Sequence, residues 1–141
     1  MIRNYHKGDS FKVKVQSEQV GEASMYADFF DRITAFTLED DNKEIMAVFG
    51  YMICEQNRAE CFALIGENIG RNMLQLVRFL IRFIPVEMRA HHISKVWMTV
   101  KKDFRAGRRL AELIGFYFAA ELPRFYLDED YQLFERKEQW L

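Results

Sequence analysis

The sequence contains few of the residues that mark disorder, cross-linking or metal binding. Its 141 residues include only two prolines, seven glycines and two cysteines. With so little proline and glycine and no low-complexity tract, long linkers are not expected. Cys54 and Cys61 are too few for a disulfide framework and lack the spacing of a zinc motif. We therefore expect two free, buried thiols.

An excess of one charge and a long hydrophobic run are also missing. The net charge is -1, which gives no general attraction to nucleic acid. Arg78 and Arg82 interrupt the longest apolar stretch, so no segment is expected to span a membrane. The N-terminal residues lack the apolar core of a signal peptide. These features predict a cytoplasmic protein with no membrane or nucleic-acid partner.

The sequence does contain a large supply of apolar side chains. Half of its residues are hydrophobic and 15% are aromatic, including 13 phenylalanines. A chain of this length can bury a core without disulfides or metals, so we expect a single domain over residues 1–141. The adjacent His91 and His92 lack a suitably spaced third ligand, and no metal site is expected.

Patterning in the first half of the chain predicts four strands and one helix. Alternation in residues 11–15 favours a short first strand, and near-helical spacing of apolar residues favours a helix over residues 17–32. Three further strands are expected at residues 33–38, 45–54 and 60–65. Because short polar turns join these three strands, they are typical of an antiparallel meander.

The second half begins with helical periodicity. Polar residues fall on one stripe of residues 70–84 and apolar residues on the rest, which predicts a helix that ends at Pro85. Residues 86–94 are expected to form a loop or a frayed helix. A strand is then expected at residues 95–100.

One more helix and two strands complete the expected order. Asp103 is a suitable N-cap for a helix that reaches Ile114, and Gly115 is a suitable residue just after its end. The final strands are expected at residues 117–120 and 131–136. A strand-helix-strand passage inside an otherwise antiparallel sheet implies one right-handed parallel crossover. The fold class is therefore α/β (α+β), with a mixed, mostly antiparallel sheet and helices on both faces.

This order of elements resembles the GNAT superfamily of acyl-CoA-dependent N-acyltransferases. The passage AELIGFYFAAELPRFYLDEDYQLFERK, residues 111–137, resembles the closing passage of that family. GENIGRNML, residues 66–74, resembles its coenzyme loop, which has an Arg or Gln leader and two glycine-type positions. The likeness covers residues 33–137 and implies a GNAT-like fold with acetyl-CoA as the coenzyme.

The resemblance also implies a set of coenzyme-binding residues. A glycine turn before a helix presents backbone N–H groups and a partial positive charge to a pyrophosphate. In the family the pantetheine arm pairs with the edge of the preceding strand, here residues 62–65. Phe104 would line the thioester, and a basic helix face would meet the phosphates. The residues implied in cofactor binding are Ile65, Gly66, Asn68, Gly70, Arg71, Phe104 and Arg108.

Departures from the family pattern leave catalysis open. The loop has no Arg or Gln leader, Asn68 stands where a small residue is usual, and Ala111 replaces the tyrosine that commonly acts as general acid. Tyr117 and Tyr126 are candidate substitutes for that acid. The candidate general bases are Glu44, Glu55, Glu60 and Glu67.

Two features allow other functions. The basic residues Lys101, Lys102, Arg105, Arg108 and Arg109 form either a solvated helix face or an anion-binding surface. Trp140 and Leu141 would serve as a packing tail or a homodimer contact.

A short GNAT-like chain with altered motifs also resembles internal virion and head-assembly proteins of short-tailed phages. The leading hypothesis is thus an N-acetyltransferase with a small-molecule or protein amine acceptor. The alternative is a non-catalytic, virion-associated or interaction protein with protein partners.

Overall fold

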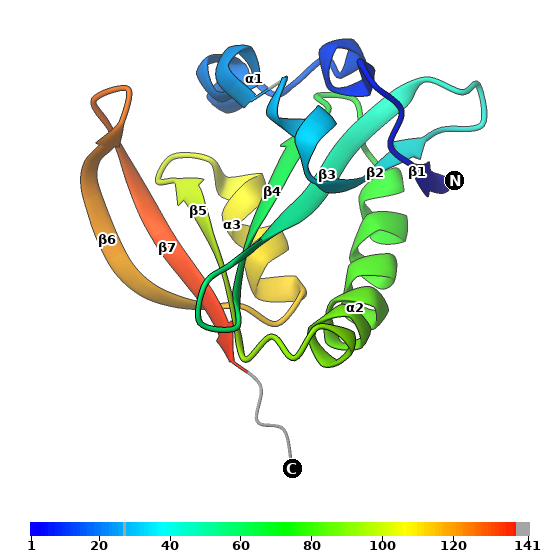
Figure 1. Cartoon of the computed structure of the whole chain (residues 1–141). Helices are drawn as coiled ribbons and strands as arrows, with labels where there is room; N and C mark the ends of the chain where they lie inside the picture. Colours follow the sequence, from blue (N-terminus) through cyan, green and yellow to red (C-terminus); the bar gives the residue numbers. More distant parts are fainter. Residues whose placement is uncertain (27, 138–141) are drawn as a thin grey trace. The chain divides into compact units, whose positions relative to one another are not determined.

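The computed structural model describes residues 1–26 and 28–137. Seven strands form one hydrogen-bonded sheet in the order β1-β2-β3-β4-β5-β7-β6 (Figure 1). The strands are β1 (Ile2–Asn4), β2 (Thr34–Glu39), β3 (Ile45–Cys54), β4 (Arg58–Ile65), β5 (Lys95–Lys101), β6 (Tyr117–Tyr126) and β7 (Glu129–Lys137). The α-helices are α1 (Val20–Tyr26), α2 (Asn72–Ala90) and α3 (Arg105–Leu113), and the 3-10 helices are η1 (Asp9–Lys12), η2 (Ser17–Gln19) and η3 (Phe29–Arg32).

Strand direction confirms the predicted fold class. β4 and β5 pair in parallel, as expected for a single crossover through α2. The pairs β1–β2, β2–β3, β5–β7 and β6–β7 are antiparallel. The sheet is therefore mixed and mostly antiparallel, with helices between its strands.

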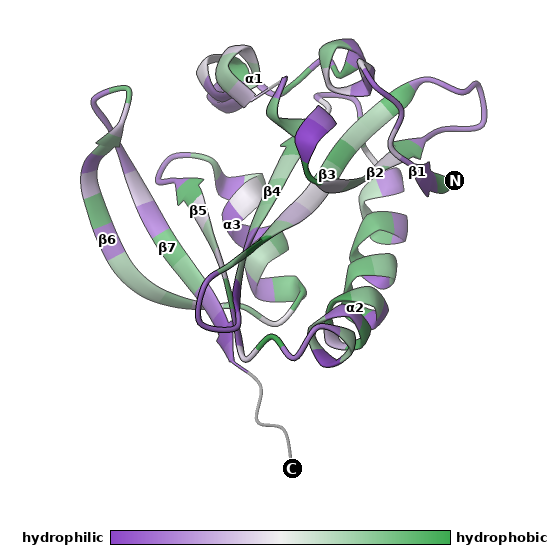
Figure 2. Cartoon of the chain, in the orientation of Figure 1, coloured by the Kyte–Doolittle hydropathy of each residue, from purple (hydrophilic) through white to green (hydrophobic). Residues whose placement is uncertain are grey.

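β3 forms where the sequence predicted it, with both ends correct. Residues 46–50 are buried consecutively, so this part of the strand is covered on both faces (Figure 2 shows its hydrophobic character). Gly50 is required inside the strand because a Cβ there would lie 2.3 Å from the Thr34 carbonyl oxygen of β2. The neighbouring predictions for β2 and β4 are correct within two residues.

The first strand was placed wrongly. Strand β1 is Ile2–Asn4, and residues 11–15 contribute the end of η1 and a single bridge between Val15 and Gly66. Side-chain bonds explain the difference, because Asp9 accepts hydrogen bonds from the backbone N–H of His6 and the hydroxyl of Thr37 and so folds the chain back. Alternating residues alone carry no information on such bonds.

The helix predicted over residues 17–32 is broken into three pieces. Only α1 is α-helical, and η2 and η3 flank it. Val20 and Met25 point into solvent, with exposed fractions of 61% and 59%, so the apolar residues do not share one buried face. Without a continuous apolar stripe, little tertiary packing supports a longer helix.

The prediction that Pro85 ends the second helix is also wrong. α2 continues through Pro85 to Ala90. Proline inside a helix costs about 3 kcal/mol because it removes one hydrogen bond and crowds the preceding turn. Met88, only 1% exposed, anchors the turn beyond the proline. Burial of such a side chain contributes about 1.5–3 kcal/mol, which largely offsets the cost.

The contacts group the chain into two compact units. The first holds residues 1–52 and 62–76, and the second holds residues 53–61 and the chain from Val77 onward. In the first unit, Val13, Phe30, Val48 and Leu64 form a buried core cluster. Side chains from segments far apart in sequence meet in this cluster, so it fixes the N-terminal segment against β3 and β4.

A buried ion pair adds to the first unit. Arg3 lies 2.7 Å from a carboxylate oxygen of Asp9 and 3.1 Å from one of Glu39. Burial opposes the charged form of Asp9, but hydrogen bonds from Arg3, the His6 backbone and Thr37 outweigh it and hold its pKa below the usual value. Asp9 therefore ties β1, η1 and β2 together as a carboxylate.

In the second unit, β5 and β7 form the long antiparallel ladder from Lys95↔Lys137 to Lys101↔Tyr131. Val96, Met98 and Val100 of β5 are buried in strict alternation. Gly115 has φ +95° and follows α3 as predicted, whereas the predicted cap at Asp103 is wrong. The N-cap is Phe104, which offers no side-chain hydrogen bond.

The cysteines are free, as expected, but both are half-buried rather than fully buried. Burial of the thiol, with a smaller contribution from Glu60, raises the pKa of Cys61 to about 12.

Within residues 1–26 and 28–137, no helix is long and apolar enough to cross a membrane. The proposed contact through Trp140 and Leu141 lies outside the described residues.

Candidate functional site

The loop between β4 and α2 holds four of the residues implied in coenzyme binding, and a fifth, Ile65, ends β4. Gly66 lies against β3, where its N–H donates to the Met46 carbonyl oxygen at 2.7 Å. A Cβ at Gly66 would lie 2.6 Å from that oxygen, so only glycine permits this approach. Gly70 has φ +47° and turns the chain into the 19-residue helix α2. The loop conformation thus depends on the two glycines that the sequence singled out.

Three backbone N–H groups of this loop are available to a ligand. The N–H groups of Glu67, Ile69 and Asn72 donate to Lys14, Gly66 and Ile69. Within the described part of the chain, those of Asn68, Gly70 and Arg71 donate to no acceptor. All three residues are exposed. Free N–H groups at a helix N-terminus, next to a residue of left-handed conformation, form a concave donor site suited to an anion.

A cavity of about 420 Å³ opens beside this loop, where Gly66 and Asn68 line it. Lys12, Lys14 and Lys43 also line the cavity, together with the carboxylates Glu39 and Glu44. Arg3 reaches it as well but is already paired with Asp9 and Glu39. The N-terminal segment therefore brings lysines to a loop whose own sequence lacks the basic leader. The sequence alone did not indicate this, because Lys12 and Lys14 lie more than 50 positions before the loop.

The edge of β4 next to the loop is covered by the chain itself. The Gln19 side chain donates through Nε2 to the Ala63 carbonyl oxygen at 2.9 Å and accepts through Oε1 from the Ile65 N–H at 2.8 Å. The Gln16 N–H donates to the Ile65 carbonyl oxygen at 3.1 Å. These are backbone groups of the strand that the resemblance assigns to the pantetheine arm. Sequence periodicity gave no signal for this contact.

The other two residues implied in coenzyme binding are Phe104, the N-cap of α3, and Arg108 within that helix. Phe104 is only 4% exposed, and a Cβ at Gly107 would lie 2.6 Å from its ring. Phe104 therefore packs tightly against its own helix. Arg108 is half-buried, and its Nε has no hydrogen-bond partner within the described residues. A buried guanidinium N–H without an acceptor is suited to an incoming anion.

The rest of the basic set is divided between paired and exposed side chains. Lys101 lies 3.8 Å from Asp103 and 4.0 Å from Glu129, and Lys102 lies 3.7 Å from Glu121. Arg105 and Arg109 are exposed on α3. The lysines are thus engaged with carboxylates at the surface, as the solvated-face interpretation expects.

The candidate acids and bases lie apart. Glu55 is exposed in the turn after β3. Tyr117 and Tyr126 are the two ends of β6 and pair with Glu135 and Glu129 of β7, which lie roughly 20 Å apart at the usual rise per residue. Ala111, which the sequence resemblance aligns with the tyrosine of the GNAT pattern, is fully buried. The structure therefore does not bring Tyr117 and Tyr126 to one site.

Glu60 has the most perturbed environment of the candidate bases. It is half-buried on β4, where it lies opposite Trp97 of β5. Burial raises the pKa of Glu60. A carboxylate that binds its proton more tightly is a better proton acceptor near neutral pH. Among the four carboxylates named from sequence, only Glu60 combines this environment with a place inside a strand.

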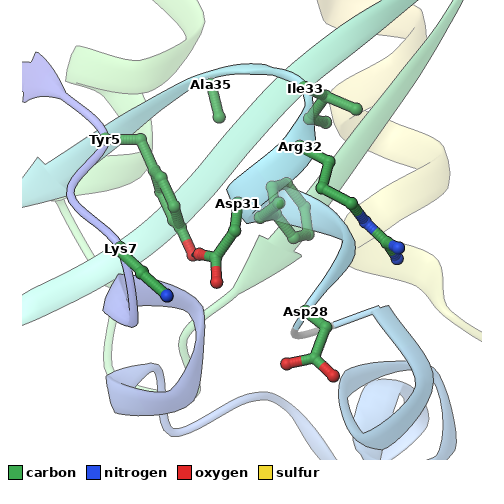
Figure 3. Close-up of a pocket in the computed structure, with 8 residues that line it drawn as sticks. Tyr5, Lys7, Asp28, Asp31, Arg32, Ile33 and Ala35 are labelled. Carbon is green, nitrogen blue, oxygen red and sulfur yellow. The ribbon is translucent and has the colours of Figure 1, made fainter.

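A second cavity, of about 660 Å³, lies in the first unit and was not expected from sequence (Figure 3). Tyr5 and Asp31 point toward one another in it, and the Tyr5 hydroxyl donates to Asp31 at 2.7 Å. Burial and the bond to Asp31 raise the pKa of Tyr5, although a hydrogen bond with Ser10 partly opposes this. The charged residues Lys7, Asp28, Asp31 and Arg32 line the cavity. Its balanced charge does not favour an anion or a cation.

Comparison of whole structures identifies the fold. No family profile and no curated protein matches the sequence. A GNAT-family acetyltransferase from Bacillus anthracis superposes with a TM-score of 0.71 and 9% identity, over 96% of this chain and 93% of that one. A ribosomal-protein-alanine N-acetyltransferase from Escherichia coli gives 0.70 and 18%, over 97% and 92%. A spermidine/spermine N-acetyltransferase from Vibrio cholerae gives 0.65 and 14%, over 97% and 91%. Over nearly its whole length, this chain has the fold of the GNAT N-acetyltransferases.

Proposed function

We propose that this protein is an acyl-CoA-dependent N-acetyltransferase. The loop between β4 and α2 carries the proposal. Its free N–H groups at Asn68, Gly70 and Arg71 face no acceptor within the described residues, and a 19-residue helix follows them. The aligned peptide dipoles of that helix add a partial positive charge at the same point. A pyrophosphate supplies the acceptors and the negative charge that this arrangement lacks.

Basic side chains complete the proposed phosphate site. Arg71 follows Gly70 directly and is exposed, so its guanidinium is free to take a phosphate oxygen. Lys12 and Lys14 line the cavity beside the loop and take the place of the missing basic leader. Separately, in the second unit, the unpartnered Nε of Arg108 on α3 is a donor suited to an anionic group. Ile65 and Gly66 hold the loop in place through their buried backbone.

The proposed chemistry needs a proton acceptor. Bound acetyl-CoA would supply an acetyl thioester, and an amine attacks it only after losing a proton. We assign Glu60 as the base that takes this proton, because burial raises its pKa. Glu55 is the weaker assignment, since it lies exposed in a turn. With Ala111 in place of tyrosine, either Tyr117 or Tyr126, or solvent, returns a proton to the coenzyme sulfur.

The proposed acceptor is an amine on a small molecule or a protein. Two of the similar structures are named for such acceptors, one for a polyamine and one for an alanine of a ribosomal protein. Identities of 14% and 18% do not carry the acceptor over to this chain. We therefore propose only the class of reaction, which is acetyl transfer to an amine, and we propose that the protein is cytoplasmic.

Thermal unfolding in acetyl-CoA tests the proposal. A ligand that binds only the folded state raises the melting temperature, and the shift grows with the logarithm of the ratio of ligand concentration to Kd. Gly70→Asp should raise the Kd for acetyl-CoA at least about tenfold, since it adds a negative charge beside the phosphate. Gly70→Asn is the matched control, because asparagine tolerates the same left-handed backbone without the charge. A Cβ has room here, with the nearest atom 3.8 Å away.

Either of two results would count against the proposal. One is the absence of any shift in melting temperature at millimolar acetyl-CoA. The other is equal acetyl-CoA affinity in Gly70→Asp and Gly70→Asn, which would remove the loop from the binding site.

A second candidate function is a non-catalytic interaction protein, including one of phage origin. Two observations favour it: Ala111 is fully buried where the family has its tyrosine, and the β4 edge is covered by Gln19. In that case acetyl-CoA would leave the melting temperature unchanged, and other proteins would be the partners.

A further inference from the structure

Gln19 has a side-chain environment that is unusual for a glutamine. It is 4% exposed, and its carboxamide forms two hydrogen bonds of opposite sense with β4, to the Ala63 carbonyl and from the Ile65 N–H. An adjacent strand would satisfy residues i and i+2 of an edge in the same way. The carboxamide of Gln19 thus takes the place of a backbone amide on this edge.

The edge in question faces away from β3. The Gly66 N–H bonds to Met46 of β3, so the backbone groups of Ile65, one residue earlier, point to the opposite side. On that side the Gln16 N–H donates to the Ile65 carbonyl at 3.1 Å, and the Glu67 N–H donates to the Lys14 carbonyl at 2.7 Å. We name residues 14–19 the clasp. It covers the edge continuously from Ala63 to Glu67.

The clasp and the free donors of the loop adjoin each other. Glu67, the last residue that the clasp holds, directly precedes Asn68, the first of the three free N–H groups. A ligand with its phosphates on Asn68, Gly70 and Arg71 and an extended arm along β4 would need the groups that Gln19 now occupies. Both sets lie in the first unit.

We propose that the clasp is an intramolecular competitor of the coenzyme. It holds the β4 edge closed, and Gln19 must leave Ala63 and Ile65 before the amide-containing arm of acetyl-CoA can pair with them. This inference rests on the proposed function and adds a regulatory step to the same site. Only the fraction of molecules with an open clasp binds coenzyme, so the apparent Kd equals the intrinsic Kd divided by that fraction.

The composition of the clasp suits release. Its hydrogen bonds to β4 and the loop come from the Gln19 side chain, from two backbone pairs and from the Gln16 side chain, which lies 3.5 Å from the Gly66 carbonyl. Of its apolar residues, Val15 packs against the core cluster. Apart from the bridge between Val15 and Gly66 it forms no strand ladder with β4. Ala63 and Ile65 would otherwise be left without partners, which explains why a buried glutamine stays there. A ligand that forms hydrogen bonds with the same backbone groups of Ala63 and Ile65 removes the cost of leaving them unpaired.

The test is Gln19→Ala, with calorimetric titration of two probes. Without the carboxamide the closed state loses both hydrogen bonds to β4, in addition to the bond from Gln19 to Glu22, so the open fraction rises. We expect the apparent Kd for acetyl-CoA to fall about 3- to 10-fold. Adenosine 3′,5′-bisphosphate carries phosphates but no pantetheine arm, and its Kd should stay the same. Gln16→Ala is the matched control, because it removes only the 3.5 Å contact and should change neither Kd.

Amide hydrogen exchange shows whether the variant opens as intended. In Gln19→Ala the Ile65 amide should exchange faster, since it donates to Gln19 in the parent protein. The Gly66 amide donates to Met46 and should keep its protection, which also reports that the unit stays folded.

The outcomes separate the inference from the proposed function. Tighter binding of acetyl-CoA alone by Gln19→Ala supports the clasp as a competitor. Equal or weaker binding of acetyl-CoA by Gln19→Ala, with the parent protein still binding, overturns the competitor and leaves the proposed function standing. No binding of acetyl-CoA by either protein overturns both.

Discussion

The two halves of β4 have different neighbours. At its beginning, Arg58, Ala59 and Glu60 pair with Lys95, Val96 and Trp97 in a regular parallel ladder. At its end, Ala63 and Ile65 bond to the side chain of Gln19. Backbone pairing fixes a strand along its length, whereas a side chain is a partner that rotation about a few bonds can withdraw. The first half of β4 is therefore structural, and the second half is suited to exchange one partner for another.

Three substitutions test this difference between the halves of β4. Removal of the charge on Asp9 should change the free energy of unfolding most. Asp9 anchors the segment from which the clasp extends, through Arg3 and Thr37. Asp9→Asn should lower the free energy of unfolding by about 3 kcal/mol, because it leaves a partly buried Arg3 without its main partner. Chemical denaturation at neutral pH measures the loss.

The pH dependence of that loss follows from the lowered pKa of Asp9. The carboxylate stabilises the fold at pH values above its ordinary pKa, and this contribution disappears as the pH falls through the lowered value. The parent protein and Asp9→Asn should therefore converge in stability in acid. Asp41→Asn, an exposed change in the turn before β3, is the control and should alter stability little. A constant difference between the parent and Asp9→Asn across the pH range would show that charge is not the cause.

Gly66→Ala should have an intermediate effect on the free energy of unfolding. Gly66 lies where β4 ends and the loop begins. Its Cβ would press on the Met46 carbonyl oxygen, and overpacking of this kind costs about 1–3 kcal/mol. Gly70→Ala is the comparison, since it has open space but a left-handed backbone and should cost about 1 kcal/mol. If Gly66→Ala proved the milder of the two, close approach to β3 would not be what fixes the loop.

Glu60→Gln should have the smallest effect on stability and tests the structural half of β4. Because burial raises the pKa of Glu60 in the folded state, the ionised carboxylate is less favourable there than in the unfolded chain. Glu60→Gln should therefore raise the melting temperature slightly at neutral pH, and the gain should vanish as the pH falls below the ordinary carboxyl pKa. At the same time the variant should lose acetyl transfer. Full activity in Glu60→Gln would remove this residue as the base.

Most of the sheet could be predicted from sequence because its strands have strong local signals. β3 was placed with both ends correct, since an apolar run lies between two polar turns. The short β1 was missed because three residues are too few to show a period. Pro85 was misread as a helix end because the burial of Met88 that supports the continuing turn is not visible locally.

The candidate site was predictable only in part, for the same reason. Gly66 and Gly70 could be found because a turn before a helix needs particular backbone conformations, and glycine marks them. The clasp could not be found, because Gln19 bonds to residues 44 and 46 positions later in the chain. A polar side chain that replaces a backbone partner leaves no periodic trace. The lysines beside the loop were missed through the same separation in sequence.

The buried Ala111 limits how this protein can be redesigned. Its side chain has no exposed surface, and its carbonyl accepts the Phe116 N–H that ends α3. Placing a tyrosine there would force a whole ring into filled space, at a cost of at least about 1–3 kcal/mol. Introducing a tyrosine at position 111 is therefore not a one-step change. Side chains packed around α3 would first have to be replaced by smaller ones, or a residue of another element would have to supply the proton.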